Sequence, residues 1–117
     1  MELNLSKNSL EAIIQELNHQ VIPEYRFNSQ RRFRFDYFIP VSGITGGGLA
    51  VEYEGIFSGK SRHTSLKGYS KDCEKYNLAL TMGIPVLRFT ALQLKDPEKI
   101  KKDILQTLEA FTFSNLV

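Results

Sequence analysis

The alternation of side chains from Arg31 to Phe38 limits the fold of this chain more than any other part of its sequence. Residues two apart in an extended strand point to the same face. One face therefore carries Phe33, Phe35 and Tyr37, and the other carries Arg32, Arg34, Asp36 and Phe38. Pro40 to Gly48 contains three consecutive glycines and predicts a turn, and Leu49 to Glu54 predicts a second strand. We expect the two strands to pair as a half-buried hairpin.

Helical spacing of apolar residues predicts three helices around this hairpin. The first is capped by Asn8 and ends near Pro23, with apolar positions Leu10, Ile13, Ile14, Leu17 and Val21. The second is capped by Ser70 and ends at Gly83, with an inward stripe of Cys73, Tyr76, Ala79 and Leu80. The third begins at Asp96–Pro97–Glu98, where a capping residue, a proline and an acidic residue follow one another.

A further strand is expected at Ile84–Thr90, and a short one at Ile56–Phe57 inside a basic loop. The order is then helix, strand, strand, loop or short strand, helix, strand, helix. This order predicts an α/β fold with a mixed sheet flanked by helices, because strand–helix–strand crossovers place helices on the faces of a sheet. With 117 residues and 42% apolar content, we expect a single domain spanning residues 1–117.

Cysteine content and hydropathy exclude several classes of protein. A single cysteine, Cys73, cannot form an internal disulfide framework or a cysteine-built zinc site. No run approaches the ~18 apolar residues of a membrane helix, and the N-terminus lacks the basic and apolar regions of a secretory signal. We therefore expect a cytoplasmic protein that does not bind a membrane.

Three carboxylates fall on the two hairpin strands: Asp36 on the first, and Glu52 and Glu54 on the second. Glu52 and Glu54 point to the same face, and Asp36 can meet them across the hairpin. Acidic side chains in an otherwise apolar strand are costly to desolvate unless a positive charge lies between them. A hard divalent cation such as Mg²⁺ satisfies that demand. The alternative is that this face is the solvated side of an antiparallel sheet.

Basic residues surround these carboxylates in the sequence. Residues 26–75 contain nine basic and five acidic side chains, although the whole chain carries a net charge of only +2. An acidic centre flanked by positive charge suits an enzyme that binds a phosphodiester backbone and cleaves it at a metal. The candidate nucleic-acid contacts are Arg31, Arg32, Arg34, Lys60, Arg62, Lys67 and Lys71.

Several blocks of the sequence resemble small phage and prophage endonucleases of the PD-(D/E)xK superfamily, which are distantly similar to very-short-patch repair endonucleases. The blocks are Glu24–Phe27, Arg31–Asp36, Leu49–Gly55, Arg62–His63, Asp72–Asn77 and Val86–Thr90. The resemblance implies a restriction-endonuclease-like core in a bacterial, phage or prophage protein. It also implies hydrolysis of DNA with Mg²⁺ or Mn²⁺.

The resemblance also implies roles for individual residues. Asp36 takes the position of the first metal ligand and Glu52 that of the acidic residue in the second motif. Glu54 stands where the superfamily commonly has lysine and is a further candidate ligand. Lys75 on the following helix is the positional substitute for that lysine. Glu24 corresponds to an N-terminal acidic ligand, with Glu11 or Glu16 on the first helix as the alternatives. His63 is the rival of Lys75, and its ordinary pKa near 6.5 suits a general acid or base.

Two other functions compete with an endonuclease. A nuclease fold that has lost catalysis would bind nucleic acid through the basic residues without cutting, and Glu54 in place of lysine keeps this reading open. A carboxylate-pair glycosidase is disfavoured by the short chain and the basic surroundings. Because small nucleases often use two active sites to cut two strands, a homodimer is one open arrangement of such an enzyme.

Overall fold

The computed structural model of the chain describes residues 6–55 and 65–112. Its elements are α1 (Lys7–Gln15), β1 (Ile22–Arg26), β2 (Arg34–Pro40), β3 (Gly48–Glu54), α2 (Leu66–Thr81), β4 (Val86–Thr90), a short 3-10 turn (Gln93–Lys95) and α3 (Pro97–Phe111). The strands lie in the order β1-β2-β3-β4, antiparallel except for the parallel pair β3–β4. The predicted hairpin and the predicted mixed α/β fold are confirmed.

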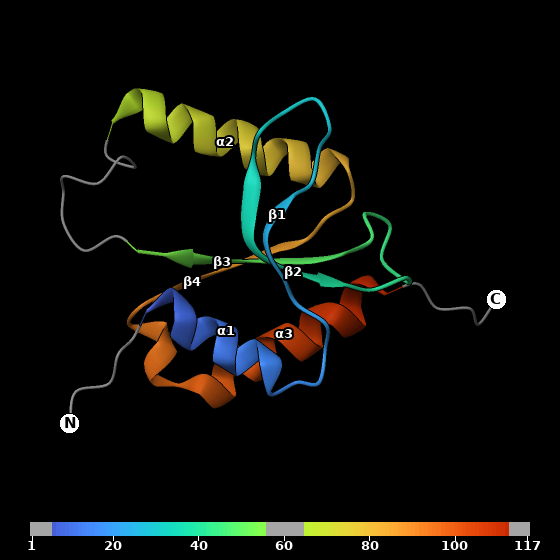
Figure 1. Cartoon of the computed structure of the whole chain (residues 1–117), viewed down its shortest axis with the longest axis vertical. Coiled ribbons are helices and arrows are strands. Elements are labelled where there is room, and N and C mark those ends of the chain that lie inside the picture. The colour runs from blue at the N-terminus through green and yellow to red at the C-terminus, as the bar shows by residue number, and fades with distance from the viewer. Residues whose placement is uncertain (1–5, 56–64, 113–117) are drawn as a thin grey trace.

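The sheet is the middle layer of three (Figure 1): α2 covers one face, and α1 and α3 cover the other. On the α2 side, the core consists of Phe27, Phe35, Phe38, Ala50, Ala79 and Ile84. On the other side, Tyr37, Ile39, Leu49 and Val51 of the sheet pack with Leu10 and Ile14 of α1 and Ile100 and Ile104 of α3. Because both faces are covered, all of β3 except Tyr53 is buried.

The backbone hydrogen bonding between β2 and β3 ends at Asp36. Backbone pairing of β2 with β3 runs from Pro40↔Gly48 to Tyr37↔Val51. Beyond that pair, side chains satisfy the backbone: the Asp36 N–H donates to Glu52 Oε1 (3.3 Å) and the Tyr53 N–H donates to Asp36 Oδ2 (2.7 Å). The strands therefore separate at the carboxylates, and each carboxylate completes the hydrogen bonding of the other strand.

The strand alternation predicted from sequence is wrong beyond Asp36. Phe35 packs on the α2 side and Tyr37 on the α1 and α3 side, although both were expected on one face. The change of face coincides with Glu24, which lies across from Asp36 on β1 and has φ of 49°. β1 itself was missed, because a five-residue edge strand containing Pro23 gives little periodic signal.

Both early helices start before the predicted caps. α1 follows Ser6 rather than Asn8 and stops at Gln15, and α2 follows Ser65 rather than Ser70. The Ser65 hydroxyl accepts the Gly68 N–H at 3.0 Å. The sequence offers two capping residues at each start, and the earlier one is used. The third helix begins as predicted, with Asp96 accepting the Lys99 N–H at 3.2 Å. The strand expected at Ile56–Phe57 lies outside the described residues.

The inward face of α2 also differs from the prediction. Tyr76 and Ala79 turn toward the sheet as predicted, but Asp72 and Lys75 turn inward with them. Cys73 is exposed and Leu80 is 77% exposed, although both were expected inward. The spacing of apolar residues alone could not predict this inward face correctly. The helix faces carboxylates as well as an apolar core, so polar residues occupy part of its inner face.

Candidate active site

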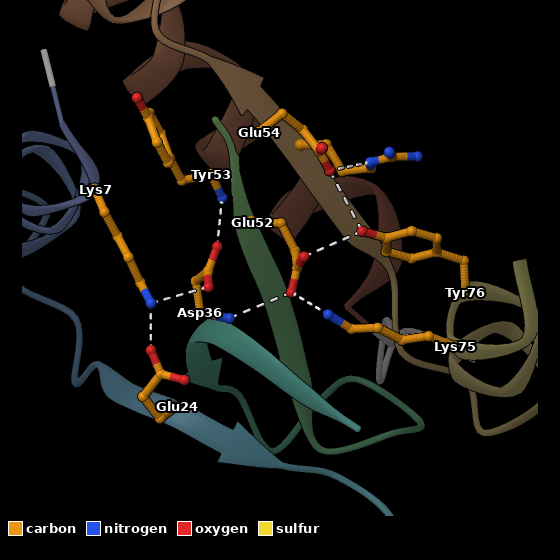
Figure 2. A network of polar contacts seen from close by, with 9 residues as sticks. Lys7, Glu24, Asp36, Glu52, Tyr53, Glu54, Lys75 and Tyr76 are labelled. Atoms are coloured by element: carbon orange, nitrogen blue, oxygen red, sulfur yellow. Dashed lines mark hydrogen bonds and ion pairs between the residues drawn. The ribbon is translucent and has the colours of Figure 1, made fainter. Parts of the chain in front are cut away.

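Four of the predicted acidic residues form a row across three strands, with basic side chains reaching them from the helices (Figure 2). Glu24 lies on β1, Asp36 on β2, and Glu52 and Glu54 on β3. The row has two ends, defined here as the Asp36 end (Glu24, Asp36 and Lys7) and the Glu52 end (Glu52, Glu54, Lys75, Tyr76 and Arg88).

At the Asp36 end, a single lysine bridges two carboxylates. Lys7, the first residue of α1, forms an ion pair with Glu24 and lies 3.0 Å from Asp36 Oδ1. The helix start is held in place because Tyr37 donates its hydroxyl hydrogen to the Lys7 carbonyl at 3.0 Å. Burial works against a charged ammonium, but the bonds to Glu24 and Asp36 outweigh it and raise the pKa of Lys7. Lys7 therefore stays charged.

At the Glu52 end, α2 supplies two donors to one buried carboxylate. Lys75 Nζ lies 2.7 Å from Glu52 Oε1, and the Tyr76 hydroxyl lies 3.1 Å from Glu52 Oε2. Glu52 is only 6% exposed. Burial raises the pKa of Glu52, and the ammonium of Lys75 opposes this rise without cancelling it. Burial and the neighbouring Glu52 raise the pKa of Tyr76, so its hydroxyl remains a donor.

Glu54 is held by a different cation. Arg88 on β4 donates from Nε to Glu54 Oε1 at 2.7 Å, and its guanidinium lies 4.4 Å from the centre of the Tyr76 ring. The Tyr76 hydroxyl is also 3.4 Å from Glu54 Oε1. Arg88 thus neutralises the Glu54 carboxylate, and Tyr76 lies between the two glutamates.

The carboxylates are not gathered into a ready metal cage. Within residues 6–55 and 65–112, no three His, Cys, Asp or Glu side chains form a group that could hold a metal ion. Each of the four carboxylates is paired with a cation of the chain. Asp36 and Glu52 are in addition joined through the backbone bonds at the strand separation. Two such carboxylates suit Mg²⁺, which binds through one or two carboxylates and retains waters.

Basic residues predicted to contact nucleic acid lie beside the Glu52 end. Gln30, Arg31, Arg32, Phe33, Arg34, Lys71, Asp72 and Lys75 line a pocket of about 490 Å³. Lys67 is exposed on the first turn of α2 and is not part of this lining. Lys60, Arg62 and His63 lie outside the described residues.

Sequence reasoning missed Lys7, Tyr76 and Arg88 as members of the site. Tyr76 and Arg88 belong to the blocks that carry the family resemblance, so a signal for them was present. Arg88 reaches the site because β4 pairs in parallel with β3 in the register Glu52↔Arg88, which the sequence does not reveal. Lys7 carries no sequence signal, since nothing distinguishes it from a solvated helix residue.

The fold is similar to that of a solved structure, "Homing Endonuclease I-Bth0305I Catalytic Domain", with a TM-score of 0.67 and 17% sequence identity. The similarity covers 90% of this chain and 94% of that chain. No protein-family model matches the sequence, and no curated protein matches it. Among the described residues, no helix is long and apolar enough to cross a membrane. The mixed α/β architecture is thus a fold that a nuclease domain also uses.

Proposed function

We propose that the chain is a nuclease that hydrolyses phosphodiester bonds in DNA at Asp36 and Glu52 with Mg²⁺ or Mn²⁺. The observation that carries this proposal is the placement of two adjacent carboxylates where β2 and β3 separate, beside a pocket lined by basic side chains. The printed name of the structural neighbour, a homing endonuclease catalytic domain, agrees with it.

The burial of Glu52 favours a functional role over a structural one. An apolar side chain in this covered strand would avoid the cost of desolvating a carboxylate, and replacing buried ion pairs by apolar residues is often neutral or stabilising. Glu52 nevertheless occupies β3 with three hydrogen-bonding partners: the Asp36 N–H, Lys75 and Tyr76. Perturbed, held carboxylates of this kind are concentrated at active sites.

Asp36 and Glu52 would hold the cation, and their oxygens are the donors that Mg²⁺ and Mn²⁺ prefer. When bound, the cation would supply a more acidic water and neutralise charge on the phosphate. Lys75 is placed to donate to a phosphate oxygen from its position beside Glu52, in the role that the superfamily lysine commonly fills. Tyr76 orients Glu52. His63 stays a predicted general acid or base.

The second candidate is a binding module without catalysis. It is favoured by the fact that Lys7 and Lys75 already neutralise Asp36 and Glu52, so the row of carboxylates is balanced by its own chain. Such a module would bind DNA through the basic pocket and would leave the phosphodiester bonds intact.

Cleavage of supercoiled plasmid distinguishes these functions. We expect nicking with Mg²⁺ or Mn²⁺, none in EDTA, and a loss of at least about 100-fold in Asp36→Asn and Glu52→Gln. Glu109→Gln, on the exposed side of α3, is the matched control and should cut like the wild type. DNA binding without cutting under every metal would favour the module. Equal cutting by all three variants would remove Asp36 and Glu52 from the proposal.

A further inference from the structure

The basic pocket holds more positive charge than its own residues balance. Its lining contains five cations and a single carboxylate, Asp72. Lys75 is paired with Glu52 and Arg31 with Glu74 at 3.6 Å, but Arg32, Arg34 and Lys71 form no ion pair with any described residue. Like charges placed this close repel one another, so an anion in the pocket would lower the energy of the folded protein.

The loop that forms one wall is held in a fixed shape by its own side chains. Asn28 Oδ1 accepts the N–H groups of Gln30 (2.8 Å) and Arg31 (3.1 Å). Arg26 donates to the carbonyls of Arg31 (2.8 Å) and Ser29 (3.1 Å). These bonds form an Asx-type turn that fixes the backbone from which the pocket arginines project. A prearranged cation cluster binds an anion at a smaller entropic cost than a flexible one.

Two contacts set the position of the arginine at the tip of this loop. The Arg31 guanidinium lies 4.4 Å from the centre of the Phe33 ring, and Phe33 stacks in turn on Phe27. The stacked rings of Phe33 and Phe27 therefore hold the Arg31 guanidinium in position. Planar guanidinium groups that are held in this way suit phosphate, which they can bind through two hydrogen bonds.

Lys75 joins the pocket to the carboxylates. Its side chain lines the pocket, yet its ammonium lies 2.7 Å from Glu52 Oε1. A strand of nucleic acid with one phosphate in the pocket would therefore pass directly to the Glu52 end of the row. The pocket measures about 490 Å³, which is ample room for one phosphate group.

We propose that this pocket seats one phosphate of the DNA strand on which the carboxylates act, next to the phosphate that faces Asp36 and Glu52. The order of the two phosphates rests on the proposed function, whereas the pocket itself does not. Recognition there is of phosphate rather than of base edges, so it carries no sequence preference.

Binding in EDTA tests the pocket without any cleavage. The probe is a fluorescein-labelled 12-nucleotide single-stranded DNA, followed by anisotropy over a range of salt concentrations. Arg34→Gln/Lys71→Gln should bind about tenfold more weakly, and the slope of log K against log salt should fall by about 0.7, the value for one phosphate on a single strand. Lys95→Gln/Lys102→Gln removes two exposed lysines outside the pocket and should lose less than about twofold. An equal loss in both double variants would overturn the pocket.

Neutral methylphosphonate groups locate the phosphate. Because the pocket reads no sequence, the probe here is a trinucleotide, whose two phosphates leave one register in which both are bound. One methylphosphonate group at either phosphate should weaken wild-type binding. Arg34→Gln/Lys71→Gln should be insensitive to the group at one phosphate, and Lys75→Gln should be insensitive at the other. Sensitivity that both variants lose at the same phosphate would overturn the assigned order.

These binding tests separate the two proposals. If the protein binds DNA through the pocket but does not cut it with any metal tried, the proposed nuclease is contradicted and the phosphate pocket is still supported. If the protein cuts DNA but the pocket double variant and the control double variant bind DNA equally well, the proposed nuclease is still supported and the phosphate pocket is overturned.

Discussion

The two ends of the carboxylate row use the same chemistry in different surroundings. At the Asp36 end, the side chains of Lys7, Glu24 and Asp36 are 38%, 53% and 22% exposed. At the Glu52 end, those of Glu52, Lys75 and Glu54 are 8%, 11% and 9% exposed, whereas that of Arg88 is 46% exposed. Water screens the ion pairs of the Asp36 end and is largely excluded from the pair of Glu52 with Lys75. The Asp36 end can therefore exchange partners readily, while Glu52 and Lys75 hold each other more tightly.

This difference has opposite consequences for stability and for binding. Exposed ion pairs contribute little, and their partners are available to a ligand. A buried pair adds little net stability, but removal of one member leaves a charge without its partner. The following variants contrast the two ends, beginning with the largest expected effect.

Lys75→Ala should destabilise the protein by about 3 kcal/mol, because it leaves the Glu52 carboxylate buried without its cation. Lys7→Ala should cost less than about 1 kcal/mol, since its partners are solvated. Urea unfolding of both variants checks the contrast. Glu52→Gln added to Lys75→Ala should restore most of the loss, and a double variant as unstable as Lys75→Ala would contradict the assignment to an unpaired charge.

Tyr76→Phe should reduce plasmid nicking about tenfold with a loss of stability of about 1 kcal/mol, because Glu52 Oε2 loses the donor that orients it. Initial nicking rates in Mg²⁺ measure the effect. Tyr69→Phe, an exposed tyrosine on the same helix, is the matched control. An unchanged rate in Tyr76→Phe would remove the tyrosine from the site.

The pH dependence of the unfolding free energy should reveal the raised pKa of Glu52. Burial raises the pKa of Glu52, so the folded state binds the proton more readily than the unfolded state. Its contribution is therefore most favourable below the ordinary glutamate value and is lost as pH rises through the raised one. Relative to the wild type, Glu52→Gln should therefore gain stability as pH rises from the ordinary glutamate value toward neutrality. Urea unfolding across this range checks it, and a difference that stays constant with pH would contradict it.

Lys7→Gln should tighten Mn²⁺ binding a few-fold, because the ammonium competes with a cation for Asp36. Titration calorimetry measures this without any substrate. Lys101→Gln is a close control, since Lys101 also bridges two carboxylates, Glu16 and Glu98, away from the site. A similar change in both variants would indicate only an effect of total charge.

Local patterns in the sequence were enough to predict the hairpin, the third helix and the mixed fold. The capping residues and alternation that signal these elements act over a few residues. The α2 face was mispredicted in part because Lys75 turns inward for a partner on β3, Glu52, which lies 23 residues earlier in the chain. The site was found only in part for the same reason. Asp36 and Glu52 stand out as acids within apolar strands, whereas Lys7 and Arg88 join them through α1 docking and the parallel register of β4.

The side-chain hydrogen bonds at the strand separation make two backbone amides sensitive to ligand binding at Asp36 and Glu52. The amides of Asp36 and Tyr53 donate to Glu52 and Asp36, whereas amides of the regular ladder donate to backbone carbonyls. A cation that binds these carboxylates, or a phosphate that binds beside them, must alter the hydrogen bonds of two backbone amides in the middle of a covered sheet. Their hydrogen-exchange rates and amide chemical shifts should therefore register ligand occupancy directly, while the paired amides of Tyr37, Phe38 and Ile39 stay constant as an internal reference.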